Sequence, residues 1–419
     1  MSKKIFLGLM ISSVFGFYAC EQKITDDEIK QVKANRPKAE ELSKQYNYSV
    51  VNVPKTFESK AALLLVDDPS QQFFGSFAPN ASGDVSIASV TDDKAKLGRI
   101  LFYEKQLSLN SNISCGSCHH QDKGFADGQQ FSMGFQGQVT PRNSMSIVNP
   151  AMAHSGMFWD RRENSPRSLT LRPVVNHIEM GMEDLKLLEI KLTGIDYYPE
   201  LFSNAYGSPV ITSERISDAL NAFLRSMITW NSRFDEGKNT NFANFTQEEK
   251  RGMELFMGKQ VSNTNNNNDP FNNFAIEEGA CNGCHGGPLF NESANQFVSP
   301  YDDHGGDGNG RGVNIGLDKV SKDKGTGDGS FKIPSLRNVE LTAPFMHDGR
   351  FKTLEEVVTH YNEKVQASAN LHRKLKDENG KPKRLNLNDA DKKALVAFLK
   401  TLTDKQFITD PKFSDPFVN

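Results

Sequence analysis

Two short motifs of the same pattern constrain the fold of this chain more than any other feature. CGSCH at 115–119 and CNGCH at 281–285 both have the form C-x-x-C-H. This pattern attaches haem c, because two thiols bond to the edge of the macrocycle while the adjoining histidine binds the iron. The predicted haem-binding residues are Cys115, Cys118 and His119 in the first motif and Cys281, Cys284 and His285 in the second. The chain is therefore expected to fold around two covalently bound haem c groups.

The cysteine pattern favours haem over two other uses of paired cysteines. The chain has five cysteines, of which four fall in the motifs and Cys20 is left over. Disulfides are the usual pairing in exported proteins, but a histidine directly after each pair argues for haem. A zinc site with two cysteines and two histidines normally needs a histidine pair at a wider spacing.

The first twenty residues have the pattern of an export signal. Lys3 and Lys4 precede a short apolar stretch that ends at Ala19 and is too short for a stable membrane span. FYAC, which ends at Cys20, resembles the lipobox of bacterial lipoproteins, in which the cysteine is acylated. We predict a periplasmic protein with a lipid anchor on Cys20. Ordinary cleavage nearby, which would leave Cys20 free, is the alternative.

Length and composition are those of a globular protein with two modest domains. The 419 residues are 37% hydrophobic and 24% charged. The net charge of −3 leaves no broad basic surface for nucleic acid. Nothing after the signal has the length and apolar character of a membrane span.

The predicted fold class is mainly α, with two cytochrome c-like helical domains that each hold one covalently attached haem. The predicted helices include 92–107, 213–230, 246–258 and 385–404. Ser213 is the expected cap of the second of these, and the helix at 246–258 parallels the one before the first motif. The predicted divisions are a signal peptide (1–19), an N-terminal extension (20–91), a first haem domain (92–235), a second haem domain (236–405) and a tail (406–419).

Segments around both motifs resemble the bacterial di-haem cytochrome c peroxidase family, which includes the methylamine-utilisation protein MauG. The matching segments are CGSCH, GFADGQQFSMGFQG, RNSMSIVNPA, FWDRR and NHIEM, followed after the second motif by FKIPSLRNVELTAPFMHDGRF. The family fold is two mainly α-helical cytochrome c domains whose haems are separated by a tryptophan. The resemblance implies a peroxidatic domain at 92–235 and an electron-transfer domain at 236–405.

The resemblance also implies roles for individual residues. Glu179 matches the distal glutamate, a carboxylate near the iron that moves a proton between the two oxygens of peroxide. Trp159 matches the tryptophan that relays electrons between the haems. A surface glutamate and a packed tryptophan are the plain alternatives. The family's calcium ligands correspond to the Asn143 side chain and to the backbone carbonyls of Thr342 and Pro344, which are oxygen donors that suit calcium.

Two positions depart from the family pattern. The family often has a glutamine ten residues after the tryptophan, whereas this chain has Leu169 and so lacks one polar partner of the peroxide. Many members carry a histidine that blocks the resting peroxidatic iron, whereas this chain has Phe135, which cannot bind iron. We therefore predict that the first haem is five-coordinate or water-bound in its resting ferric state and needs no reductive activation.

The candidates for the sixth ligand of the second haem are Met346, His347, His360 and Tyr361. Thr353 and Glu356 form a capping box, which predicts that a helix starts at Thr353. The residues expected to share its apolar face are Leu354, Val357, Val358 and Tyr361. His360, about 100° further around the helix, is expected to be more exposed. The family has methionine or tyrosine at the position of Tyr361, so Tyr361 is the preferred ligand and Met346 the alternative.

The resemblance implies an oxidoreductase that reduces hydrogen peroxide with electrons from a small cytochrome c or another redox protein. A phenolate at Tyr361 is a hard, anionic donor that favours ferric iron. This feature points to a MauG-like alternative, in which the enzyme oxidises residues of a partner protein. A non-enzymatic electron carrier or redox sensor is a further alternative, which Leu169 allows.

Overall fold

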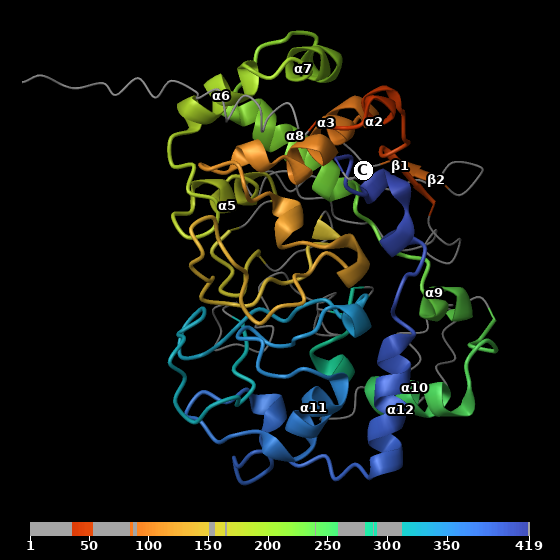
Figure 1. Cartoon of the computed structure of the whole chain (residues 1–419). Coiled ribbons are helices and arrows are strands. Elements are labelled where there is room, and N and C mark those ends of the chain that lie inside the picture. The colour runs from red at the N-terminus through yellow and green to blue at the C-terminus, as the bar shows by residue number, and fades with distance from the viewer. Residues whose placement is uncertain are drawn as a thin grey trace, which may run out of the picture. The chain divides into compact units, whose positions relative to one another are not determined.

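Short α-helices and long connections make up most of this protein (Figure 1). The computed structural model describes residues 36–52, 84–86, 90–150, 156–163, 166–238, 240–258, 281–287, 289–290 and 312–417. The predicted signal peptide and the lipid anchor on Cys20 lie outside these residues, as does most of the extension at 20–91. From Pro37 onward the chain belongs to one compact unit. None of the described helices is long and apolar enough to cross a bilayer.

The secondary structure confirms the mainly α fold class. The helices are α2 (Ala39–Ser43), α3 (Asp92–Tyr103), α4 (Pro166–Leu169), α5 (Arg172–Val175), α6 (Leu185–Thr193), α7 (Tyr198–Tyr206), α8 (Ser213–Ser226), α9 (Arg233–Lys238), α10 (Gln247–Met257), α11 (Leu354–Thr359) and α12 (Asp389–Lys400). The strands β1 (Val50–Asn52) and β2 (Asp84–Ser86) form one antiparallel pair.

Each half of the chain is built on one closely packed helix pair. Helix α3 packs on α8 in the first half, and α10 packs on α12 in the second. A Cβ atom on Gly98 of α3 would lie 1.9 Å from the backbone oxygen of Ala219, so only glycine permits this approach. Likewise, a Cβ atom on Gly252 of α10 would lie 1.9 Å from the backbone oxygen of Ala394 in α12. The shared packing agrees with the parallel that the sequence suggested between the helix at 246–258 and the one before the first motif.

These four helices fall within the four predicted segments, but one predicted cap is wrong. Thr212 caps α8, because its side chain accepts a hydrogen bond from the Arg215 N–H at 3.3 Å. Ser213 is instead the first helical residue, and its N–H donates to the carboxylate of Glu189. The helix also ends at Ser226, four residues before the end of the predicted segment.

Helix α9 carries a buried ion pair at the junction of the two halves. The guanidinium of Arg337 donates two hydrogen bonds to the carboxylate of Asp235, at 2.8 and 3.0 Å. Both side chains are fully buried. The predicted domain boundary between residues 235 and 236 falls inside this helix, and that boundary stays a prediction.

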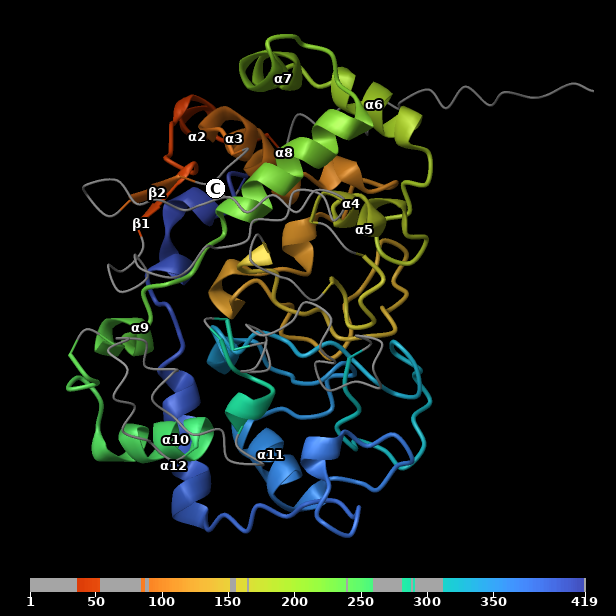
Figure 2. The same ribbon diagram turned by 180° about the vertical axis from the view of Figure 1, so that it is seen from behind.

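The C-terminal tail packs on the first half (Figure 1, Figure 2). The ring of Phe407 lies 5.6 Å from that of Phe125, and the ring of Phe413 lies 6.1 Å from that of Phe223. The hydroxyl of Tyr103 in α3 donates to the carbonyl of Phe413 at 2.6 Å. Both views accordingly show the C-terminus beside α3 of the first half, although the tail directly follows α12 of the second half in sequence.

Candidate haem sites

Both C-x-x-C-H motifs fold into the same local structure. Each begins with a single 3-10 turn, Cys115–Ser117 in the first and Cys281–Gly283 in the second. In each motif the histidine N–H donates to the carbonyl of the first cysteine, at 3.0 Å in the first and 2.8 Å in the second. All four cysteines are free thiols, so none is committed to a disulfide. The turn brings both thiols and the imidazole to one place, as haem attachment requires.

The two histidines are held so that one ring nitrogen of each is available to a metal. Nδ1 of His119 lies 2.8 Å from the carbonyl of Phe125, and Nδ1 of His285 lies 2.9 Å from the carbonyl of Phe290. A carbonyl only accepts, so Nδ1 carries the proton and Nε2 keeps its lone pair. Burial lowers the pKa of both histidines, which favours the neutral form that binds metals.

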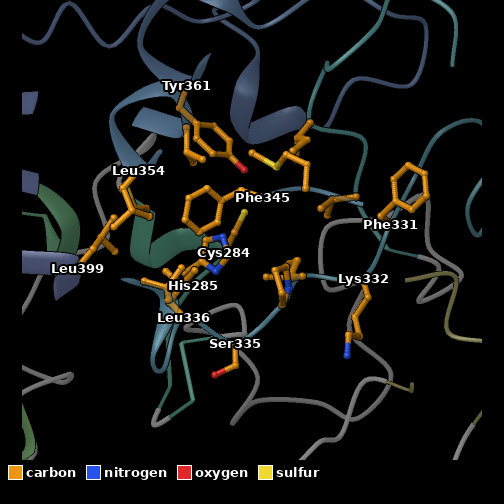
Figure 3. A pocket seen from close by; sticks show the side chains of 18 of the residues that line it. Cys284, His285, Phe331, Lys332, Ser335, Leu336, Phe345, Leu354, Tyr361 and Leu399 are labelled. Atoms are coloured by element: carbon orange, nitrogen blue, oxygen red, sulfur yellow. The ribbon is translucent and has the colours of Figure 1, made fainter. Parts of the chain in front are cut away.

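An apolar cavity of about 270 Å³ adjoins the second motif (Figure 3). Cys281, Cys284 and His285 line it, and so do Tyr361 and Met346. Figure 3 shows the Tyr361 hydroxyl directed towards the part of the cavity that holds Cys284 and His285. The cavity thus has two thiols and an imidazole together with a phenol and a thioether.

The Tyr361 hydroxyl has no hydrogen-bond partner in the described part of the chain. Burial raises the pKa of Tyr361, and the nearby thiols of Cys284 and Cys281 act in the same direction. A hydroxyl that faces an apolar cavity without a partner is unfavourable unless a further group binds it. These residues therefore fit a haem, whose iron would accept both the imidazole of His285 and a donor from the other side.

Helix α11 confirms the predicted capping box and apolar face. Thr353 is the N-cap, its side chain accepts from the Glu356 N–H at 3.2 Å, and the Glu356 carboxylate accepts from the Thr353 N–H. All residues of the predicted face line the cavity, namely Leu354, Val357, Val358 and Tyr361. The helix then widens into a π-turn at His360–Lys364, a feature that often marks functional sites.

The predicted exposure of His360 is wrong. This residue is 2% exposed, and its Nε2 lies 3.0 Å from the carbonyl of Ile315. Its ring also packs near Phe351, at 5.6 Å between ring centres. The helix phase alone placed His360 off the apolar face, but the loop before Gly316 covers that side. His360 is absent from the cavity lining, whereas Met346, His347 and Tyr361 are all part of it.

Glu179 lies close to the first motif. Its backbone carbonyl accepts a hydrogen bond from the Phe135 N–H at 3.0 Å. Burial raises the pKa of the Cys115 and Cys118 thiols, and the charge of Glu179 adds to both rises. Burial also raises the pKa of Glu179 itself, while the positive charge of Arg162 opposes that rise. Among the residues described, none hydrogen-bonds to the Glu179 carboxylate.

The two positions that depart from the family pattern supply no ligand or polar group. Phe135 is 7% exposed, and a Cβ atom on Gly181 would lie 2.3 Å from its ring. The ring therefore packs directly over Gly181, near Glu179. Leu169 is the last residue of the short helix α4 and is partly buried.

Trp159 is hydrogen-bonded to both halves of the chain. Its indole Nε1–H donates to the carbonyl of Asn143 at 2.9 Å. Its own carbonyl accepts from the Lys332 N–H at 2.8 Å. The Asn143 N–H in turn donates to the carbonyl of His347, also at 2.8 Å. Trp159 also lines the cavity at the second motif, so it lies where the two halves meet.

The three residues predicted to bind calcium belong to the lining of the cavity at the second motif. Asn143, Thr342 and Pro344 all line the cavity. The Asn143 side-chain nitrogen donates to the carbonyls of Gln129 and Gln130, which leaves its side-chain oxygen for another partner. No cluster of three or more His, Cys, Asp or Glu that could hold a metal occurs among the described residues. The predicted calcium site consists of amide and carbonyl oxygens, so it differs from such a cluster. The calcium ion stays a prediction.

Lys332 and Arg162 are two residues of these sites that sequence reasoning did not identify. Lys332 lines the cavity at the second motif. The positive charge of Arg162 lowers the pKa of Glu179. Both occur within segments that carried the family resemblance, FKIPSLRN and FWDRR. Their neighbours in space come from distant parts of the chain, so residue type and spacing gave no signal.

Comparisons with known proteins agree with this arrangement. The family model "Di-haem cytochrome c peroxidase" matches residues 92–241. Cytochrome c551 peroxidase of Nitrosomonas europaea is 30% identical over 330 residues, which are 78% of this chain and 83% of that protein. The methylamine utilization protein MauG of Methylophilus methylotrophus is 26% identical over 75% of this chain and 83% of its own.

A solved structure has the same fold. It is that of a MauG-like protein associated with microbial copper homeostasis, with a TM-score of 0.64 and 29% identity. The match covers 78% of this chain and 94% of that one. The fold, the paired haem motifs and the relatives lead to one conclusion: this chain belongs to the di-haem cytochrome c peroxidase family and is an oxidoreductase of that type, which implies two haem c groups.

Proposed function

We propose that this protein reduces hydrogen peroxide to water at the first haem, with electrons from a small cytochrome c that pass through the second haem. One peroxide, two electrons and two protons give two water molecules. The observation that carries the proposal is Glu179, a partly buried carboxylate near the thiols of the first motif with no other described partner. Haem iron, when bound to His119, supplies the electrons that break the O–O bond.

Glu179 is the proposed proton carrier. Its carboxylate oxygen takes a proton from the inner oxygen of peroxide and gives it to the outer oxygen, which leaves as water. Burial raises the pKa of Glu179, which favours a carboxyl group that can both accept and return a proton. Phe135 packs beside it and cannot bind iron, which supports an open position for peroxide at the first haem.

Trp159 is the proposed relay between the two haems. It lines the cavity of the second haem and is held by hydrogen bonds to Asn143 and to Lys332. These bonds fix the indole relative to both halves of the chain. We propose His285 and Tyr361 as the ligands of the second iron, with Met346 as the alternative to Tyr361, and Asn143, Thr342 and Pro344 as ligands of a calcium ion.

A MauG-like activity, oxidation of residues in a partner protein, is the second candidate. Tyr361 favours it, because a phenolate ligand would stabilise the ferric state of the second iron. A non-enzymatic carrier or sensor is the third, since Leu169 leaves the peroxide with one polar partner fewer than in much of the family. The export signal and the anchor on Cys20, and hence a periplasmic location, are proposals that rest on the sequence alone.

Steady-state consumption of peroxide with a reduced small cytochrome c separates these candidates. Turnover supports the peroxidase proposal. No turnover, together with a slowly decaying oxidised spectrum after peroxide, would favour the MauG-like activity. No reaction with peroxide would reject both enzymatic activities.

The resting ferric electron paramagnetic resonance spectrum tests the proposed coordination directly. One high-spin signal from an open first haem and one low-spin signal from the second are expected. Two low-spin signals would contradict the open first site.

A further inference from the structure

Apart from histidines, the only titratable nitrogen side chains in the described lining of the cavity at the second motif are three lysines. They are Lys332, Lys374 and Lys383, and no Asp, Glu or Arg lies in the described lining. A cavity with several cations and no anion is suited to a ligand that carries negative charge. The ammonium of Lys374 already donates to the carbonyl of Gly283, inside the second motif.

Lys332 differs from Lys374 in having no such partner. Its backbone N–H donates to the Trp159 carbonyl, but its ammonium makes no hydrogen bond or ion pair within the described ranges. Burial lowers the pKa of Lys332 to about 8, and the nearby positive charge of Arg161 lowers it further in the same direction. In Figure 3 this side chain lies on the side of the pocket opposite Leu354 and Leu399.

An ammonium that lines a mostly apolar cavity without an anion is unfavourable, and the nearby guanidinium of Arg161 increases the cost. The ligand that the proposed function brings to this cavity is a haem, and a haem c carries two carboxylates on one edge. We propose that Lys332 binds a carboxylate of the second haem and so holds that carboxylate close to the Trp159 segment. This inference rests on the proposed haem at His285.

The pairing would make Lys332 a positioning residue in two respects. The ammonium would hold the carboxylate side chain of the haem in one position. The backbone N–H of Lys332 also donates to the Trp159 carbonyl, so Lys332 would bind both the haem carboxylate and the Trp159 backbone. A cation beside the haem also makes electron uptake more favourable, so Lys332 would raise the reduction potential of the second haem.

The test compares Lys332→Met with Lys332→Arg in the haem-loaded protein. In Lys332→Met the second haem should lose about tenfold in its equilibrium constant for reduction, about 59 mV for one electron. Lys332→Arg keeps the charge and should restore most of this shift. Lys319→Met, an exposed lysine in the same half, is the matched control and should leave the potential unchanged.

The propionate-bending band in the resonance Raman spectrum separates a direct contact from a general effect of charge. Lys332→Met should shift this band, whereas Lys374→Met should change the potential and leave the band in place. An unchanged potential and band in Lys332→Met, or a shift confined to the first haem, would overturn the inference.

Haem stoichiometry is measured first on each protein. Two haems per chain in the unsubstituted protein establish the cofactors on which the inference depends, so fewer would reject the proposed function and not the lysine contact. If Lys332→Met fails to incorporate its second haem, Lys332→Leu, which likewise lacks a charge and a donor, takes its place, and the same two outcomes apply.

Discussion

At the scale of single residues, the protonation of Glu179 is set by two opposing effects. Burial of its carboxyl raises its pKa, because the charged form loses hydration. The guanidinium of Arg162 lowers it, because a positive charge stabilises the carboxylate. Arg162 is itself held by an ion pair with Asp160 at 2.7 Å and by the face of the Phe158 ring. The proposed proton transfer at the first haem would therefore depend on the charge of Arg162, a residue that no sequence motif marked.

Removal of the Glu179 carboxylate should abolish most peroxide turnover. In Glu179→Gln, kcat for peroxide is expected to fall by about 10²–10⁴-fold, the usual contribution of a positioned proton carrier. Glu183→Gln is the matched control, because Glu183 is exposed and four residues further along the chain. Equal turnover in both variants would exclude Glu179 from the reaction. The measurement is steady-state consumption of peroxide with a reduced cytochrome donor.

Removal of the Arg162 charge should move the acid limb of the pH profile. Glu179 must be deprotonated to accept a proton, so activity is lost as pH falls through its pKa. In Arg162→Gln that pKa rises further, and activity should be lost at a higher pH than in the unsubstituted protein. The comparison uses kcat/KM against pH, with Arg167→Gln as an exposed control. A midpoint that stays in place or moves to lower pH would contradict this electrostatic role.

At the scale of elements, α11 and its π-turn decide which side chains meet the second haem. The capping box fixes the start of the helix, and four residues of one face line the cavity. The π-turn begins at His360, one residue before the proposed ligand Tyr361. A one-residue shift in phase at this point would exchange the two side chains. The start of the helix and its wider last turn together direct the phenol into the cavity.

Loss of the Tyr361 hydroxyl should change the second haem and leave the first one intact. In Tyr361→Phe the low-spin ferric signal of the second haem is expected to change. Its reduction potential is expected to rise, because a phenolate ligand favours ferric iron. Met346→Leu, in the same cavity, should leave both unchanged. The reverse outcome for the two variants would make Met346 the ligand.

At the scale of the whole molecule, segments distant in sequence hold the two halves together. Hydrogen bonds link Trp159 and Asn143 of the first half to Lys332 and His347 of the second. The C-terminal tail packs Phe407 and Phe413 on the aromatic residues of the first half. The tail follows the second haem domain in sequence, yet its contacts stabilise the first.

A substitution in the tail should therefore destabilise the first half. Phe413 is 2% exposed, so Phe413→Ala is expected to cost about 3–5 kcal/mol of unfolding free energy. Val320→Ala, at a side chain 83% exposed, should cost less than about 0.5 kcal/mol. Thermal unfolding followed at the absorbance of each haem measures both. A loss below about 1 kcal/mol in Phe413→Ala would show that the tail contributes little.

Features that depend on residues close together in the sequence were predicted better than features that depend on residues far apart. The paired motifs, the helix segments and the capping box at Thr353 were predicted, because each depends on residues a few positions apart. The cap of α8 and the burial of His360 were predicted wrongly. Thr212 competes with Ser213 for the same N–H groups, and His360 is covered by a loop more than forty residues earlier in the chain.

The two haem c motifs, the mainly α class and the family could be predicted from the amino-acid sequence, because these reside in short motifs and their order. Which groups face each site depends on the tertiary structure. It brought Arg162 within reach of the Glu179 charge and tied Trp159 to Lys332. It also left the Tyr361 hydroxyl without a partner in the described chain. Such relations depend on the packing of segments far apart in sequence, which no local pattern encodes.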